Sequence, residues 1–287
     1  MTFCFNLKAK VFLLFSISLV TKTFIFVSLE KTKIQVSLRY FIELSYNGKA
    51  YHGWQIQPNA ITVQAVLEKG LSTLLKEPIS TMGAGRTDAG VHAKQLFAHF
   101  NTNTTFDIST LIYKLNSFLP EDISIQNIFK VNAEAHARFH AISRQYLYRI
   151  ALEKNPFNIE QALLLRPKLD IKKLKEATKI ILDYKDFQCF SKSNTDVKTY
   201  NCNIMKAEWQ QVENELHFTI KADRFLRNMV RAIVGTLINI GIGKIEVEKL
   251  HDIIKSKNRC EAGFSVPAHA LYLTEIEYPK TIKQNIE

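Results

Sequence analysis

Cysteine is scarce in this sequence, and its positions do not suggest a site built from cysteines. The four residues are Cys4, Cys189, Cys202 and Cys260, and the two nearest in sequence are 13 positions apart. Because no CxxC pair occurs, neither a zinc ribbon nor a framework of disulfides is indicated. The pattern fits a protein that works in a reducing compartment.

Acidic residues are too few to balance the basic ones. Lysine and arginine number 38 against 27 aspartates and glutamates, which gives a net charge of +11. Residues 1–36 contain five lysines and one glutamate, so +7 of the +11 belongs to the other 251 residues. Such an excess suits a polyanionic partner, either nucleic acid or an anionic membrane surface.

The sequence offers no convincing transmembrane segment. VFLLFSISLV at residues 11–20 follows Lys8 and Lys10 as in a secretory signal, but Lys22 interrupts the apolar stretch and no small-residue cleavage site follows. A helix needs about 20 apolar residues to cross a bilayer. Three explanations stay open: a start codon placed too far upstream, which we favour, a targeting or membrane-associating segment, and an extra ordered element. Membrane association is not expected.

Apolar periodicities predict strands and helices that do not alternate strictly. Strand-like alternation starts near residue 39 and ends at the turn signal Asn47-Gly48, and helical spacing runs from Thr62, as N-cap, to Glu77-Pro78. Further strands are predicted at about 79–82, 95–100, 123–131, 142–153, 204–212, 216–222 and 271–276. Further helices are predicted at about 107–119, with Asp107 as cap, at 171–182 and 225–240, and in two later stretches. This order predicts an α+β fold with a largely antiparallel sheet.

The segment GAGRTDAGVHA at Gly83–Ala93 concentrates residues that chemistry requires. It holds three glycines, an arginine, an aspartate and a histidine between two predicted strands, which places a carboxylate on a tightly turning backbone. An ordinary turn is one interpretation. A dinucleotide-binding loop is a weaker one, because the third glycine is displaced and a strand follows. A Walker loop is excluded, because no Lys-Ser or Lys-Thr follows the glycines.

This segment closely resembles the active-site motif of the pseudouridine synthase A family, and the resemblance extends over about residues 38–277. Similar motifs follow in the family's order: YxGWQxQ at Tyr51–Gln57, HARFHA at His136–Ala141, RQYLYRI at Arg144–Ile150 and FLRNMVRAIVGTL at Phe225–Leu237. The resemblance implies an α+β pseudouridine synthase fold. Its largely antiparallel central sheet would be built from two ferredoxin-like halves, with flanking helices and a cleft between the halves.

The resemblance also implies a function. The family isomerises uridine to pseudouridine on the 3′ side of the anticodon arm of tRNA, at tRNA positions 38 to 40, and needs neither cofactor nor metal. It works as a homodimer on tRNA, so we expect a cytoplasmic enzyme. Rival interpretations are an RNA-binding protein on the same fold without turnover, a nucleotide-cofactor enzyme and a membrane-associated protein.

Three residues receive roles from the resemblance, and a fourth, Arg86, receives one from its place two residues before Asp88. Asp88 would be the catalytic residue, as nucleophile or as base or electrostatic stabiliser. Arg231 would be its ion-pair partner, because a carboxylate in a dry pocket needs a cation to stay ionised. Tyr146 would stack on the extruded uracil, with Tyr148 the better candidate for a core residue. Arg86 would contact the phosphate of the flipped nucleotide or brace the loop through a salt bridge.

Other residues of these motifs keep open interpretations. Arg224, Arg227 and Arg231 are spaced i, i+3, i+7, which would place them on one face of the helix predicted at 225–240. For the first two, a solvated basic stripe touching phosphates is as good an interpretation as any other. His136 and His140 are spaced for a metal on a helix, but structural or RNA-contacting roles are favoured.

The remaining predictions concern packing and domains. Trp54 and Gln55 are expected to pack or anchor their loop first and to contact RNA second. Three segments are expected: an N-terminal extension at 1–37, a catalytic subdomain with the aspartate loop at 38–152, and a subdomain at 153–287 that completes the cleft.

Overall fold

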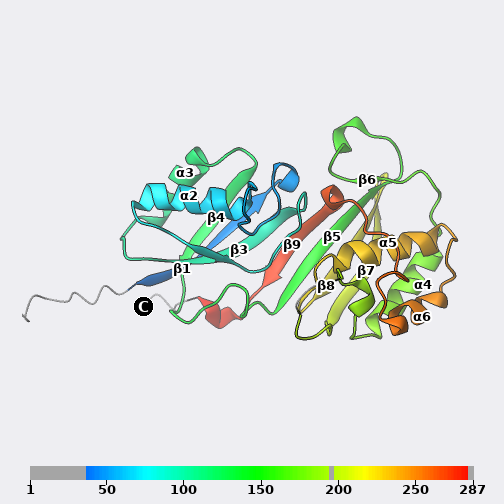
Figure 1. Cartoon of the computed structure of the whole chain (residues 1–287). Coiled ribbons are helices and arrows are strands. Elements are labelled where there is room, and N and C mark those ends of the chain that lie inside the picture. The colour runs from blue at the N-terminus through cyan, green and yellow to red at the C-terminus, as the bar shows by residue number, and fades with distance from the viewer. Residues whose placement is uncertain (1–36, 194–196, 284–287) are drawn as a thin grey trace, which may run out of the picture. The chain divides into compact units, whose positions relative to one another are not determined.

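The computed structural model describes residues 37–193 and 197–283, which combine helices and strands (Figure 1). The α-helices of this part are α2 (Val63–Leu75), α3 (Ile108–Phe118), α4 (Ile171–Leu182), α5 (Met229–Gly241) and α6 (Lys249–Ser256). Its strands are β1 (Leu38–Tyr46), β2 (Thr81–Gly83), β3 (His92–Thr102), β4 (Ile123–Lys130), β5 (Ser143–Ala151), β6 (Leu163–Leu164), β7 (Ile204–Val212), β8 (Glu215–Ala222) and β9 (Leu271–Glu277). Its short 3-10 helices are η1 (Gly48–Ala50), η2 (Pro156–Asn158), η3 (Gln188–Phe190), η4 (Ala268–Ala270) and η5 (Lys280–Ile282).

One sheet joins all the strands of the described residues. Its order is β4-β1-β3-β9-β5-β8-β7, while β2 pairs with β3 and β6 pairs with β5. The pairs β3 with β9 and β5 with β6 are parallel, and the others are antiparallel. A mostly antiparallel sheet with flanking helices is of the α+β class, so the predicted fold class is confirmed.

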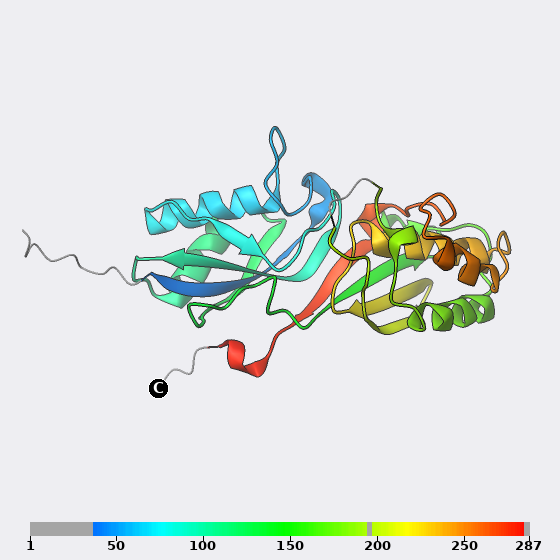
Figure 2. The ribbon, with the colours of Figure 1, turned by 60° about the horizontal axis from the view of Figure 1, so that its bottom comes forward.

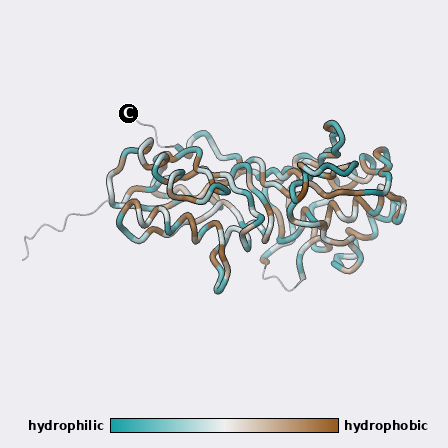
Figure 3. The backbone as a smooth tube through the Cα atoms, turned by 90° about the horizontal axis from the view of Figure 1, so that it is seen from above, coloured by the Kyte–Doolittle hydropathy of each residue, from teal (hydrophilic) through white to brown (hydrophobic). Residues whose placement is uncertain are grey.

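Two hydrophobic cores pack on this sheet within the compact unit Leu38–Glu287. One core joins α2 and α3 to β1, β3 and β4, and the other joins α4, α5 and α6 to β5, β7 and β8. We call the elements around the first core the N-terminal half and those around the second core the C-terminal half. Apolar stretches occur in the backbone of both halves (Figure 3). β9 runs between the halves (Figure 1, Figure 2) and gives Leu273 and Ile276 to the first core, while Val91 belongs to the second. The division at residues 152 and 153 stays a proposal.

Three helices begin at side chains that accept hydrogen bonds from the first turn. Thr62 accepts one from a backbone N–H of α2, Asp107 one from α3, and Asp170 two from α4. Such caps satisfy N–H groups that have no partner inside the helix, and each stabilises its helix by about 1 kcal/mol. The predicted starts at Thr62 and Asp107 and the predicted bounds of α4 are confirmed.

The predicted start of α5 at Phe225 is wrong. The helix begins at Met229, because Asn228 has a left-handed backbone with φ 68° and ends the irregular segment before it. Within that segment the Asp223 carboxylate accepts a hydrogen bond from the Arg224 N–H, an arrangement typical of turns. Two further helical stretches were predicted after α5, but the described chain there contains one α-helix, α6, and the short 3-10 helices η4 and η5.

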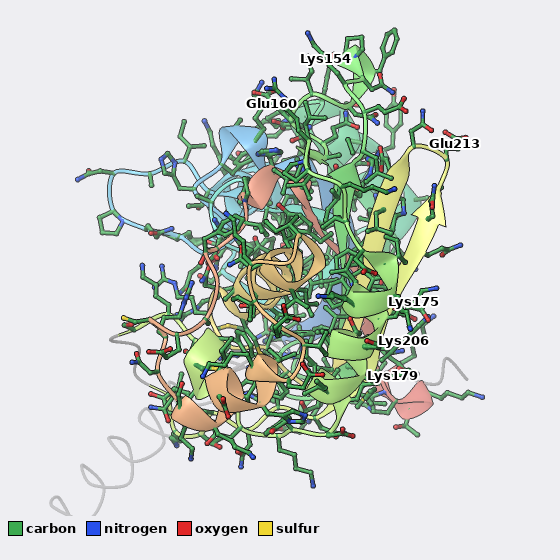
Figure 4. All side chains as sticks on the ribbon, turned by 90° about the vertical axis from the view of Figure 1, so that its right-hand side faces the viewer. Lys154, Glu160, Lys175, Lys179, Lys206 and Glu213 are labelled. Atoms are coloured by element: carbon green, nitrogen blue, oxygen red, sulfur yellow. The ribbon has the colours of Figure 1, made fainter. Side chains whose placement is uncertain are left out.

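The described residues contain no helix that is long and apolar enough to cross a membrane. Several basic side chains lie on their surface. Lys175 and Lys179 of α4 and Lys206 of β7 are exposed and project outward from the half that contains these elements (Figure 4). The predicted N-terminal extension lies outside the described residues, apart from its last position. Positive charge therefore lies on the folded part as well.

Candidate active site

The segment Gly83–Ala93 links β2 to β3, as predicted, and presents Asp88. Thr87, the residue before Asp88, is buried, and its hydroxyl is hydrogen-bonded to the hydroxyl of Tyr46 at 2.8 Å. The Asp88 side chain is 28% exposed. The loop thus anchors its backbone through Thr87 and leaves the next side chain, a carboxylate, open to a ligand.

A second loop, at residues 51–57, is hydrogen-bonded to the segment Gly83–Ala93, the aspartate loop. The N–H of Trp54 donates to the carbonyl of Thr87, and the N–H of Gly90 donates to the carbonyl of Tyr51. Gly53 has φ +90°, and a Cβ there would collide with the carbonyl oxygen of Thr87. Only glycine allows this approach of two backbones. The motif at Tyr51–Gln57 therefore positions Asp88 through backbone contacts.

Arg231 lies in the first turn of α5 and faces the Asp88 carboxylate. Its Nη1 is 3.4 Å from Asp88 Oδ2, and its Nε donates to the carbonyl oxygen of Val266 at 2.7 Å. The Arg231 side chain is 22% exposed. The bond to Val266 fixes the plane of the guanidinium, so the structure brings together the two residues that the sequence paired, in a set orientation.

The predicted stripe of three arginines on one helix face is wrong, because α5 starts after Arg224 and Arg227. Arg227 nevertheless reaches the site from the irregular segment, since its Nε lies 3.9 Å from Asp88 Oδ1. Its side chain is 59% exposed. Arg224 forms no ion pair with any residue that the structure describes.

Tyr146 of β5 lies at the seam of the two halves, because it packs against both hydrophobic cores. Its ring meets that of Phe225 edge-on, with centroids 5.2 Å apart. Burial raises the pKa of Tyr146 to about 12, and the negative charge of Asp88 acts in the same direction. The phenol is therefore neutral near pH 7. Tyr148 is fully buried and donates to the carbonyl of Pro267, which confirms its prediction as a core residue.

Arg86 is exposed two residues before Asp88. Among the described residues it has no ion-pair or hydrogen-bond partner, so the salt bridge considered from the sequence does not form with any of them. Trp54 is 2% exposed and is a packing residue, as predicted. Gln55 is exposed and so does not pack in the core, while its expected role in anchoring the loop stays a prediction.

Comparison with known proteins identifies the family. A family model described as "tRNA pseudouridine synthase" matches residues 184–279. A Parabacteroides distasonis protein named "tRNA pseudouridine synthase A" is 51% identical over 245 residues, which are 85% of this chain and 97% of the relative. The chain belongs to the tRNA pseudouridine synthase A family. A synthase A of Bacteroides fragilis is 50% identical, with 85% of this chain and 98% of the relative aligned, and one of Thermoanaerobacter sp. is 38% identical, with 83% and 98% aligned.

Arg144 is a residue of this synthase A chain whose role the sequence did not reveal. It stands two residues before Tyr146, and its guanidinium donates to four backbone carbonyls, those of Ala84, Arg138, Ala141 and Asp223. These carbonyls lie in the aspartate loop, in the turn before β5 and in the segment before α5. Arg144 therefore ties together three segments around the site. Two of the acceptors, Ala84 and Asp223, are 60 and 79 positions from Arg144, and a backbone carbonyl leaves no signal in the sequence.

The histidines of the HARFHA motif hold a turn in this synthase A chain. His140 accepts a hydrogen bond from the backbone N–H of His136 through Nδ1, and His136 accepts one from Arg138 through its own Nδ1. Both rings thus bind the backbone of their own turn. The residues described here contain no group of side chains that could hold a metal ion.

Proposed function

We propose that this chain isomerises uridine to pseudouridine in tRNA, with Asp88 as its catalytic residue. One observation supports this site above all: an accessible carboxylate on a braced loop, with an oriented guanidinium 3.4 Å from its Oδ2. Family membership supports the reaction. The positive charge of the described part favours binding of a polyanion.

The reaction breaks the bond from C1′ to N1 of uridine, turns the detached uracil and forms a bond from C1′ to C5. The hydrogen on C5 leaves as a proton and N1 takes up a proton, so the isomerisation is balanced without an oxidant, a reductant or a cofactor. Both fragments have to be held between the two bond changes. An extruded base bound in a pocket meets this requirement, because it can turn without leaving the enzyme.

The ionised Asp88 carboxylate serves this reaction in one of two ways. It attacks C1′ as a nucleophile, or it acts as base and electrostatic stabiliser while a glycal-like intermediate forms. Arg231 supports either role, because its guanidinium lies 3.4 Å from Oδ2 and attracts the negative charge of the carboxylate. The bond from Arg231 to Val266 keeps the guanidinium in place throughout.

Two further residues are proposed to bind the substrate. The neutral ring of Tyr146 would stack on the extruded uracil, since an aromatic face binds any flat base. Arg86 would contact a phosphate of the flipped nucleotide, since it is exposed and has no described partner.

The finer features of the function are also proposals. The resemblance supports the 3′ side of the anticodon arm as target, a homodimer as the working form and the cytoplasm as location. Light scattering tests the dimer, which a single species at monomer mass would contradict. Mapping of the modified uridines tests the target.

The decisive experiment measures tritium release from tRNA labelled at C5 of uridine. The full chain is compared with Asp88→Asn, which keeps the shape of the side chain and removes its charge. Carbodiimide mapping then locates the modified sites. We expect release by the native chain alone, with similar tRNA binding by both proteins.

The other outcomes are informative as well. Release by both proteins would exclude Asp88 as the essential carboxylate. Release by neither, with tRNA still bound, would indicate an RNA-binding protein on a synthase fold.

A further inference from the structure

Two cations face Asp88, one on each carboxylate oxygen. Arg231 Nη1 lies 3.4 Å from Oδ2, and Arg227 Nε lies 3.9 Å from Oδ1. Among the described residues no other side chain or N–H group donates to this carboxylate. The two oxygens of Asp88 are therefore not equivalent, since a different arginine faces each.

The two arginines differ in how firmly their head groups are held. Arg231 is 22% exposed and has a second bond, from Nε to the carbonyl of Val266. Arg227 is 59% exposed, and Asp88 is the one ion-pair partner it has in the described part of the chain. An exposed pair at this distance contributes about 0–1 kcal/mol, so another anion can displace Asp88 from Arg227 at little cost.

The backbone of Arg227 is fixed, although its head group is exposed and forms only one long ion pair with the residues that the structure describes. Its carbonyl accepts a hydrogen bond from the N–H of Lys192. The next residue, Asn228, has φ 68° and donates from Nδ2 to Ser265 Oγ at 2.6 Å. Asparagine tolerates this left-handed backbone better than most residues do. Arg227 is thus a long side chain anchored beside Asp88, with a guanidinium that can move.

We propose that Arg227 is an exchangeable substrate-binding cation, which faces Asp88 Oδ1 in the free enzyme and moves to a phosphate beside the target uridine when RNA binds. This inference rests on the proposed function. A phosphate is only four bonds from C1′ of the same nucleotide, so a uridine placed at Asp88 brings a phosphate close to this site. A guanidinium binds phosphate through two parallel hydrogen bonds, which favours the exchange.

The exchange has a consequence for the chemistry. When Arg227 moves, Oδ1 loses its cation while Oδ2 keeps Arg231. Oδ1 is then the oxygen that is free to approach C1′ or to accept a proton. The departure of Arg227 thus couples arrival of the RNA to exposure of the reactive oxygen.

The test compares Arg227→Gln and Arg227→Lys with the native chain, with Arg224→Gln as the matched control. Arg224 lies three positions earlier in the same segment, and its replacement removes the same charge. Tritium release from labelled tRNA gives kcat and KM at several salt concentrations. Circular dichroism checks that the variants fold.

We expect Arg227→Gln to raise KM about ten-fold and to reduce the slope of log kcat/KM against log salt by about one, as for the loss of one phosphate contact. Its kcat should stay within about three-fold, because Arg231 still holds Oδ2. Arg227→Lys should keep the salt slope, since the charge remains. Arg224→Gln should leave the slope unchanged.

Three results would overturn the role of Arg227 while the native chain is active. An unchanged salt slope in Arg227→Gln would exclude the phosphate contact. Loss of kcat at saturating tRNA would place Arg227 in the chemical step instead. An equal change of slope in Arg224→Gln would indicate a general basic surface. A native chain that releases no tritium would instead overturn the proposed function, and this inference with it.

Discussion

The guanidinium of Arg231 makes two contacts that a lysine ammonium cannot reproduce together. Its Nε is bound to Val266 while its Nη1 faces Asp88, so the planar group spans a carbonyl and a carboxylate. We predict that Arg231→Lys lowers kcat by about 100-fold, equivalent to about 3 kcal/mol, while the fold is kept. Tritium release under saturating tRNA measures this, and near-native turnover would exclude the ion pair as a requirement.

The ring of Tyr146, and not its hydroxyl, is the part that the proposed stacking uses. No hydrogen bond of this hydroxyl to another described residue is present, whereas the ring packs on Phe225 and on both cores. We predict that Tyr146→Phe keeps turnover within a few-fold and that Tyr146→Leu loses roughly 10- to 100-fold, the usual effect of removing a base-stacking ring. Equal turnover of the leucine variant and the native chain would contradict stacking.

Membership in a motif suggested which residues belong to the site, but it did not predict what Arg144 and Arg227 contact. Asp88 and Arg231 were paired from motifs 143 positions apart, and the structure places them within 3.4 Å. The contacts of Arg144 were not predicted, because its partners are backbone carbonyls, and every residue type has a backbone carbonyl. The prediction that Arg227 lies on a helix was wrong. Asn228, the next residue, has a left-handed backbone and donates a hydrogen bond to Ser265, and a contact between residues so far apart in sequence cannot be predicted from local periodicity.

The contact of α5 with the segment after Cys260 links helix packing to the site. A Cβ on Gly235 would collide with the carbonyl oxygen of Phe264, and Thr236 accepts a hydrogen bond from the N–H of Gly263 at 2.8 Å. Two residues later the same segment supplies the Val266 carbonyl that orients Arg231. The packing of α5 and the geometry of the ion pair are therefore coupled.

We predict that Gly235→Ala costs about 1–3 kcal/mol of unfolding free energy and also lowers kcat roughly 10- to 100-fold through displacement of Val266. Gly70→Ala in α2 is the matched control, because its Cβ would meet only side chains, the nearest at 3.3 Å. It should change the stability by less than about 1 kcal/mol, since alanine favours the helix. Urea unfolding and tritium release test both variants, and an active Gly235→Ala would refute the coupling.

Strand β3 and the turn before β5 are joined by a histidine that must be neutral. His99 accepts a hydrogen bond from the N–H of Ala137 through Nδ1, and it is buried. Burial first, and then the positive charges of His136 and Arg39, lower the pKa of His99 to about 4 from an ordinary value of 6.5. The unfolded chain therefore binds a proton in a pH range where the folded chain does not.

The pH dependence of stability follows from this difference. The contribution of neutral His99 to the free energy of unfolding is complete above pH 6.5 and is lost as the pH falls from 6.5 toward 4. The free energy of unfolding should fall by about 2 kcal/mol between pH 7.5 and pH 5 from this group alone. His99→Asn places an acceptor near Nδ1 without a titrating group, so it should reduce this loss. Urea unfolding at the two pH values tests it, and an unchanged pH dependence in the variant would contradict the prediction.

For the whole molecule, local signals predicted the strands and helices but not the order of the strands in the sheet. A helix cap such as Thr62 or Asp107 can be predicted from the few residues that follow it, and the starts predicted for α2 and α3 were correct. The parallel pairing of β3 with β9 joins residues such as Ala93 and Leu273, which nothing local relates. That pairing places β9 beside both cores and so sets the seam at which Tyr146 lies.

Residues 1–36 lie outside the part of the chain that carries the proposed site. The whole proposed site, both cores and every described strand lie between residues 37 and 283. The Parabacteroides distasonis relative aligns over 97% of its length with only 85% of this chain, so little of that relative is left to match the rest. We therefore predict that a chain starting at residue 37 folds and keeps the native kcat.

Removal of residues 1–36 should nevertheless change tRNA binding in one measurable way. These residues have a net charge of +4, which adds to the +7 of the remainder. Their loss should raise KM at low salt, and the difference from the full chain should shrink as salt rises, because screening weakens attraction between distant charges. Tritium release over a range of salt tests this. A fall in kcat that persists at saturating tRNA and high salt would instead mean that residues 1–36 contribute to the active site itself.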